Sequence, residues 1–184
     1  SEDRTAVRRV EAYLNGITTL AGRFLQTSSG GREATGRFYM WRPGRLRFQY
    51  DPPVPDLIIA TGDLVIHYDR ELKTASQIFQ SATPAAFLLQ PDIRFERDFE
   101  ITGLARGAGV LSLTFVQAKD PEAGSVTLIL GDNPLALREW RVLDPQGIET
   151  RVSLLDYQVG GRLDPKLFEF NEPTWLDEER KGGN

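Results

Sequence analysis

The chain has 184 residues, no cysteine, a formal net charge of -4 and a pI near 5.1. Its arginines and lysines are scattered, so the composition gives no general attraction to nucleic acid, and the lack of cysteine excludes disulfides and thiol nucleophiles. No apolar run approaches the ~20 residues that a membrane-spanning helix needs. The length fits a single domain over residues 1–184, and we expect a flexible, charge-rich tail from about residue 176.

The first predicted element is a short amphipathic helix over residues 4–17. Val7, Val10, Leu14 and Ile17 recur at helical spacing, and Gly16 marks the end of the pattern. After the helix, alternating apolar and polar segments are separated by Gly-Gly, Pro-Gly and Pro-Pro steps, which predicts a series of strands. These predicted strands cover residues 19–28, 34–42, 45–50, 56–61, 64–69 and 73–79.

The middle of the chain predicts a second short helix at residues 83–89, with Thr83 as its N-cap, Pro84 at its first position and Pro91 after its end. Residues 93–99 fit a strand or a helical turn equally well. Strand patterns resume at 110–118, 125–131, 135–143 and 149–159. The chain is therefore predicted to be mainly β, with a single, strongly curved antiparallel sheet of about ten to eleven strands. Such a sheet is an unclosed β-barrel, and the short helices would form a lid over its concave apolar face.

Catalytic chemistry is poorly supplied in this sequence. The only histidine, His67, lies in a strand pattern on the side opposite Ile66 and Tyr68, which favours a structural role. No glycine-rich loop forms a phosphate cradle, and no histidine or cysteine cluster forms a metal site, so neither a cofactor nor a metal is expected. A hydrolase that uses two carboxylates as acid and base stays open, because Asp and Glu residues from different turns could converge in one pocket.

Residues 20–50 carry the most specific pattern in the chain. They contain G-R-F-L-Q at 22–26, a strand that begins with Gly36, R-P-G-R-L-R-F at 42–48, and a tyrosine-acid-proline ending at 50–52. Side chains from 45 to 50 alternate between apolar and polar, as in a half-buried strand. In this pattern the chain resembles the LolA-type carriers, which move acylated lipoproteins across the periplasm of Gram-negative bacteria. Residues 91–109 match that family only weakly.

The resemblance implies an acyl-chain cavity on the concave face of the unclosed barrel, beneath a lid of helices. The lining residues that it implies are Phe24, Phe38, Met40, Leu46, Phe48, Ile59, Leu64 and Ile66. The implied lid residues are Val7, Val10, Leu14, Phe87, Leu88 and Leu89. In the family, the arginine of the Arg42-Pro43 step hydrogen-bonds lid carbonyls and holds the empty cavity closed. From the residues alone, an arginine at a strand end would equally reach solvent or pair with a carboxylate, and the apolar residues would equally form an ordinary core.

The resemblance also implies a function and partners. It implies a soluble, non-enzymatic periplasmic chaperone, expected to be monomeric and to have lost a signal peptide. Its partners would be acylated lipoproteins, an inner-membrane lipoprotein-releasing transporter and, if one exists, an outer-membrane acceptor, with no nucleic acid among them. Two other functions stay open: a carrier or sensor of another lipid on the same fold, and the carboxylate-dependent hydrolase.

Overall fold

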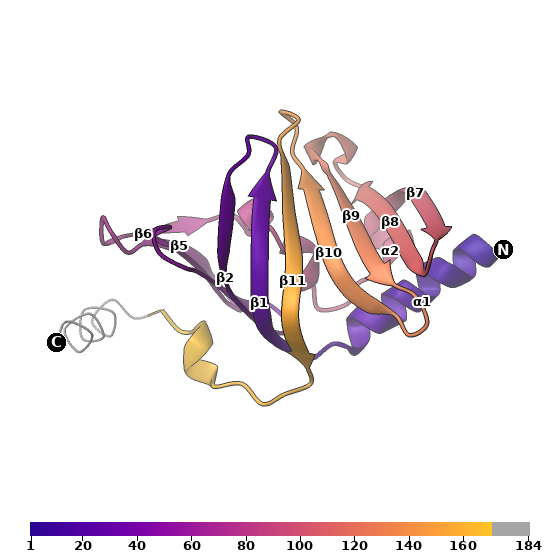
Figure 1. The fold of residues 1–184 in the computed structure, drawn as a ribbon. Helices are drawn as coiled ribbons and strands as arrows, with labels where there is room; N and C mark the ends of the chain where they lie inside the picture. Colours follow the sequence, from indigo (N-terminus) through magenta and orange to yellow (C-terminus); the bar gives the residue numbers. More distant parts are fainter. Residues whose placement is uncertain (171–184) are drawn as a thin grey trace.

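The computed structural model describes residues 1–170, which form one eleven-stranded antiparallel sheet with a long N-terminal helix (Figure 1). The helix, α1 (Glu2–Gly16), begins at Ser1, whose hydroxyl accepts a hydrogen bond from the Arg4 amide. The strands that follow α1 are β1 (Thr19–Ser28), β2 (Glu33–Trp41), β3 (Arg45–Tyr50), β4 (Asp56–Thr61), β5 (Val65–Asp69) and β6 (Thr74–Ile78). The later strands are β7 (Phe99–Gly107), β8 (Val110–Gln117), β9 (Ser125–Gly131), β10 (Ala136–Leu143) and β11 (Glu149–Val159).

The sheet consists of two meanders that meet at the pairing of β1 with β11. The strand order is β6-β5-β4-β3-β2-β1-β11-β10-β9-β8-β7, so β6 and β7 are the two edges and the barrel does not close. Figure 1 shows the sheet curving around α1, which runs behind the strands of the second meander. The predicted fold class, a mainly β chain with one unclosed antiparallel sheet, is confirmed.

Strand β7 is the one strand that the sequence did not predict. Its pairing with β8 is irregular between Ile101 and Gly103, where the register shifts by one residue. A shift of this kind reverses the side of the sheet that each later residue faces, so no continuous alternation runs through the strand. Its second half, Gly103 to Gly107, also lacks the β-branched and aromatic residues that mark a strand.

The predicted helix at 83–89 is instead two short 3-10 turns, η1 (Gln80–Ala82) and η2 (Ala86–Leu89). Thr83 lies between them with an extended backbone, and its hydroxyl donates back to the Gln80 carbonyl rather than capping a following helix. The ambiguous stretch at 93–99 divides into a single helical turn, α2 (Phe95–Asp98), and the start of β7. Two further 3-10 turns are η3 (Pro121–Ala123) and η4 (Pro165–Phe168).

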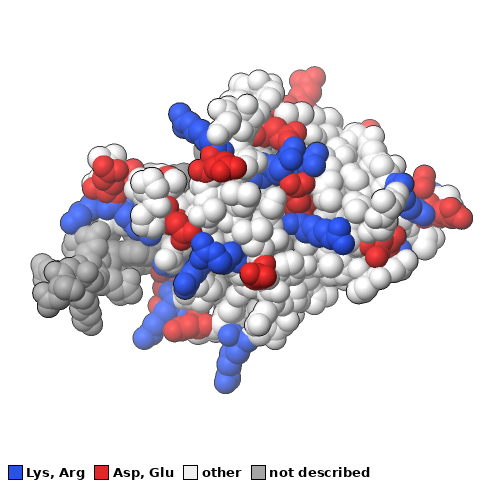
Figure 2. All heavy atoms as spheres, in the orientation of Figure 1, with Lys and Arg blue, Asp and Glu red and all other residues white. Residues whose placement is uncertain are grey.

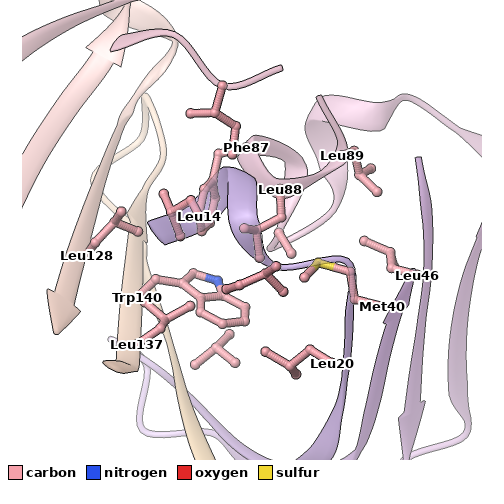
Figure 3. Close-up of a cluster of buried hydrophobic side chains, with 14 of the residues drawn as sticks. Leu14, Leu20, Met40, Leu46, Phe87, Leu88, Leu89, Leu128, Leu137 and Trp140 are labelled. Atoms are coloured by element: carbon pink, nitrogen blue, oxygen red, sulfur yellow. The ribbon is translucent and has the colours of Figure 1, made fainter. Parts of the chain in front are cut away.

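The main core fills the space between the inner face of the sheet and the helices. We call the inner face the one that carries Phe38, Phe48 and Trp140, all of which are fully buried. α1 and residues 80–95, together named the lid, pack onto this face, as Figure 3 shows for Leu14, Phe87 and Leu88.

The outer face carries a second, smaller cluster. Leu57, Ile59 and Tyr68 pack together there, and Phe170 from the end of the described chain covers them. Phe168 of η4 packs edge-on against Trp41, with 6.3 Å between ring centroids. The segment after β11 therefore crosses the outside of β2 to β5 and buries apolar side chains on that side of the sheet as well. The predicted tail from about residue 176 lies outside the described residues.

Candidate functional site

The lid side chains enter the core rather than lying on its surface. Val10 and Leu14 of α1 and Phe87, Leu88 and Leu89 of η2 are buried in the main cluster, and Val7 packs against it partly exposed. All six residues predicted for the lid therefore lie between the lid and the inner face. Because η2 follows no regular amphipathic period, its three consecutive apolar residues are buried by the fold around them and not by one helical face.

Five of the eight predicted lining residues are on the inner face beneath this lid. They are Phe24, Phe38, Met40, Leu46 and Phe48, and each has no exposed surface. The rings of this group are in contact: Phe24 meets Phe48 edge to face at 5.2 Å between centroids, and Phe38 meets Phe48 at 4.7 Å. Gly36 opposite Phe24 makes this possible, since a Cβ at Gly36 would lie 2.9 Å from the Phe24 ring.

The prediction for the other three lining residues, Ile59, Leu64 and Ile66, is wrong. In the register of β3 with β4, Leu46 and Phe48 face Ala60 and Ile58, so these two point inward and Ile59 points outward. Ile66 pairs with Ile59 and shares the outer face, and Leu64 lies in the turn before β5, 46% exposed. Four consecutive buried residues in β4 gave no alternation from which the inward side could be read.

Arg42 connects the end of β2 with both parts of the lid. Its side chain is only 7% exposed, and it donates to the carbonyls of Leu14 (2.6 Å), Gln90 (2.8 Å) and Leu88 (3.2 Å). A fourth, longer bond of 3.5 Å reaches Oδ1 of Asn15. The three carbonyls come from the C-terminal turn of α1 and from the residues at the end of η2. The Leu14 carbonyl also accepts from the Ile17 amide at 3.2 Å, whereas those of Leu88 and Gln90 lie where a helix leaves its last carbonyls without an internal partner.

The electrostatic setting of Arg42 supports a hydrogen-bonding role. Burial lowers the pKa of its guanidinium, and the negative charge of Asp92 raises it in part. A guanidinium stays charged under such shifts, so these bonds to neutral carbonyls are charge-assisted and stronger than ordinary ones. Pro43, the second residue of the predicted step, is exposed in the turn after β2 and follows a cis peptide bond.

Three further side chains fasten the lid, and the sequence did not indicate them. Trp140 of β10 donates from its indole Nε1 to the Pro84 carbonyl at 2.7 Å. Asn15 of α1 donates to the Ile93 carbonyl and accepts from the Ile93 amide, both at 2.9 Å. Glu11 accepts a hydrogen bond of 2.9 Å from the Phe95 amide. An asparagine or a glutamate near the end of a surface helix is common, so the sequence carries no signal for these contacts.

A cavity of about 410 Å³ opens beside the lid, between residues 80–90 and strands β7 to β10. Its apolar walls include Phe87, Phe99 and Phe115 together with Val126 and Val142. Among the described residues that line it, Asp120 is the single carboxylate, whereas acid-base hydrolysis requires two carboxylates. The cavity thus offers apolar contact next to the elements that Arg42 holds.

His67 lies away from this cavity. As predicted, it is on the side opposite Ile66 and Tyr68, which is the inner face. Its Nε2 lies 2.5 Å from Oδ1 of Asp56 on the neighbouring strand β4, in the first meander of the sheet. The two residues line a separate depression with Tyr50 and Gln26.

Comparison with known proteins identifies the family. Residues 15–171 match the family model described as outer membrane lipoprotein carrier protein LolA. A relative named outer-membrane lipoprotein carrier protein from Methylococcus capsulatus is 31% identical over 95% of this chain and 88% of its own length. A protein of the same name from Pseudomonas aeruginosa is 30% identical over 96% of this chain and 88% of its own length.

Solved structures share the fold at low identity. A LolA superfamily protein from Nitrosomonas europaea aligns with a TM-score of 0.50 at 8% identity, covering 89% of this chain and 97% of the other. An uncharacterized conserved protein from Thermus thermophilus aligns with a TM-score of 0.55 at 13% identity, covering 93% of this chain and 95% of the other. The resemblance drawn from residues 20–50 is thereby confirmed, and the chain belongs to the LolA family of outer membrane lipoprotein carrier proteins.

Proposed function

We propose that this protein carries acylated lipoproteins, holding their acyl chains between the inner face of the sheet and the lid. The observation that supports this most directly is the set of hydrogen bonds from Arg42 to the carbonyls of Leu14, Leu88 and Gln90, which we call the Arg42 clasp. The clasp joins both parts of the lid to the sheet above the apolar cluster of the inner face, through bonds that can break while the strands stay paired. Family membership supports the same function, and the protein is a carrier rather than an enzyme.

The energetics explain why such a carrier is needed and how it opens. Burying one CH₂ group contributes about 0.8 kcal/mol, so a chain of about sixteen carbons costs on the order of 10 kcal/mol to leave in water. The inner face is already filled by lid side chains such as Leu14 and Leu88, so acyl chains must replace those contacts. Since one set of apolar contacts substitutes for another, lid opening is a population shift driven by the ligand.

The wider pathway follows from the family. In this proposal the protein works in the periplasm as a monomer, receives its cargo from an inner-membrane lipoprotein-releasing transporter and delivers it to the outer membrane, to an acceptor if one exists. Within residues 1–170, no helix is long and apolar enough to cross a membrane. Figure 2 shows positive and negative side chains interspersed over the face in view, without a large area of one sign.

Native mass spectrometry tests the proposal. The purified protein is incubated with a triacylated lipopeptide and, separately, with simple fatty acids. We expect a stable one-to-one adduct with the lipopeptide, because several acyl chains bury more apolar surface than one. Equal retention of fatty acids would indicate a carrier of another lipid, and the absence of any adduct would overturn lipid carriage altogether.

A further inference from the structure

Gln90 holds an unsatisfied polar atom at the centre of the candidate site. Its side-chain Oε1 is buried and has no hydrogen-bond partner, which is true of no other buried side-chain nitrogen or oxygen among residues 1–170. Buried carbonyl oxygens are nearly always paired, and an unpaired one makes the closed state less stable than a paired one would. This oxygen therefore has the capacity to accept a hydrogen bond that the protein itself does not supply.

The position of Gln90 suggests that a ligand supplies the missing hydrogen-bond donor for Oε1. Gln90 is one of the residues that line the cavity beside the lid, together with Phe87, Phe99 and Phe115. For an acyl chain that occupies this cavity with its head toward Gln90, the group at the head is the one that Oε1 can meet. The groups at that place differ in chemistry: an amide presents an N–H donor, whereas an ester or an ionised carboxylate presents acceptors alone.

We propose that Gln90 makes this site prefer acyl chains attached through an amide N–H over chains attached through an ester or ending in a free carboxylate. The inference rests on the proposed function, since it concerns the same acyl-binding site. An N-acylated terminal cysteine carries such an amide, whereas membrane diacylglycerol lipids carry only ester-linked chains. Gln90 would thus help to separate a lipoprotein from the surrounding membrane lipid.

The same residue links recognition to lid opening. The backbone carbonyl of Gln90 accepts a bond of 2.8 Å from Nη2 of Arg42, and the side-chain oxygen of the same residue is buried in this closed state. Moving residues 83–90 away from the sheet breaks the Arg42 bond and uncovers Oε1 at once. A ligand with an N–H donor regains one hydrogen bond for those that are lost, and a ligand with acceptors alone does not.

A competition between two matched probes tests the inference. The first probe is a triacylated lipopeptide, and the second is the same molecule with an ester oxygen in place of the acyl amide N–H and a deuterated acyl chain that separates the masses. We expect the wild-type protein to retain the amide probe about tenfold more, the factor that one hydrogen bond to an otherwise unpaired buried group supplies.

Two variants complete the experiment. Gln90→Met keeps the length of the side chain and removes the acceptor, so we expect the probes to bind equally while the melting temperature stays the same or rises. Gln117→Met makes the same change at an exposed glutamine of the same cavity and should keep the wild-type ratio.

The outcomes separate the two proposals. Equal binding of both probes by the wild type, or an unchanged preference in Gln90→Met, would overturn the role of Gln90 and leave lipid carriage standing. No binding of either probe by the wild-type protein would overturn lipid carriage itself, and the inference with it.

Discussion

Arg42 illustrates how one residue couples parts of the chain that are far apart in sequence. A guanidinium has five donors in a rigid plane and no acceptor, so it suits several carbonyls converging from different elements. Here it reaches the end of α1 and both residues 88 and 90, and its burial at 7% exposure excludes the water that would otherwise compete for those carbonyls. Among the described residues, Arg42 donates to no carboxylate. Its bonds therefore fix the position of the lid without forming a tight ion pair.

Replacing Arg42 with leucine keeps bulk and removes every donor. We expect Arg42→Leu to lower the free energy of unfolding by about 2–4 kcal/mol, because the Leu88 and Gln90 carbonyls lose their partner and the Leu14 carbonyl keeps only its bond from the Ile17 amide. Hydrogen exchange at residues 83–90 should accelerate, and lipopeptide loading or release should change. Arg45→Leu is the matched control, since the Arg45 guanidinium stacks on Trp41 at 4.0 Å and, within residues 1–170, no side-chain hydrogen bond joins it to the lid. Unchanged hydrogen exchange and unchanged lipid transfer in Arg42→Leu would refute the role of the Arg42 bonds in holding the lid closed.

At the scale of elements, the lid is held by side-chain bonds and apolar contacts instead of a backbone ladder. Residues 80–95 contain only two 3-10 turns and the first residue of α2, so few of their backbone groups are paired within the segment. Asn15 and Glu11 of α1 supply partners for the amides of Ile93 and Phe95, so α1 and residues 80–95 are joined to each other as well as to the sheet. The two parts are therefore expected to move together.

Asn15→Leu tests this connection. The change removes both bonds to Ile93 and leaves its amide and carbonyl unpaired, so we expect a loss of about 1–3 kcal/mol in the free energy of unfolding. Amide exchange at Ile93 and Phe95 should rise more than exchange in α1 itself. If residues 80–95 kept their wild-type protection, the two parts of the lid would not depend on Asn15 for their connection.

The whole molecule consists of a continuous sheet and a lid that side chains attach to it. Every strand pairs with at least one neighbour through backbone hydrogen bonds, and β1 pairs with β11 over nearly its whole length. Since the sheet has open edges at β6 and β7, we expect its strands to stay paired while the lid moves. Local opening of this kind draws on the least stable parts of a structure, which here are the elements without ladder bonds.

Hydrogen exchange on loading with a triacylated lipopeptide should reveal this division. We expect exchange to increase at the end of α1 and in residues 80–95, because the ligand replaces lid contacts, and to stay slow in β1, β2 and β11. The fully protonated, lipid-free protein measured under the same conditions provides the reference. Faster exchange in the central strands would mean that loading opens the sheet and would contradict a lid that moves over a rigid surface.

Much of the site could be predicted because one side of β3 is polar. In β3 an apolar residue alternates with a polar one, which assigns Leu46 and Phe48 to one face, and the same parity continued back into β2 assigns Phe38 and Met40 to it. The structure places all four residues there. In β4 the alternation is absent, because the segment after β11 covers the outer face and buries Leu57 and Ile59. The assignment of Ile59 and Ile66 failed for that reason, since burial from a distant part of the chain leaves no local signal.

Ten of the eleven strands within residues 1–170, the unclosed sheet and the family could be read from the residues, because these depend on alternation, turn residues and the motif at 22–52. The carbonyls that Arg42 reaches, the bonds by which Trp140, Asn15 and Glu11 fasten the lid, and the unpaired oxygen of Gln90 are visible in the folded chain alone. The physical reason is that alternation and turn preferences act between neighbouring residues, whereas these bonds join groups separated by up to 84 residues, whose distances are set by the curvature of the whole sheet.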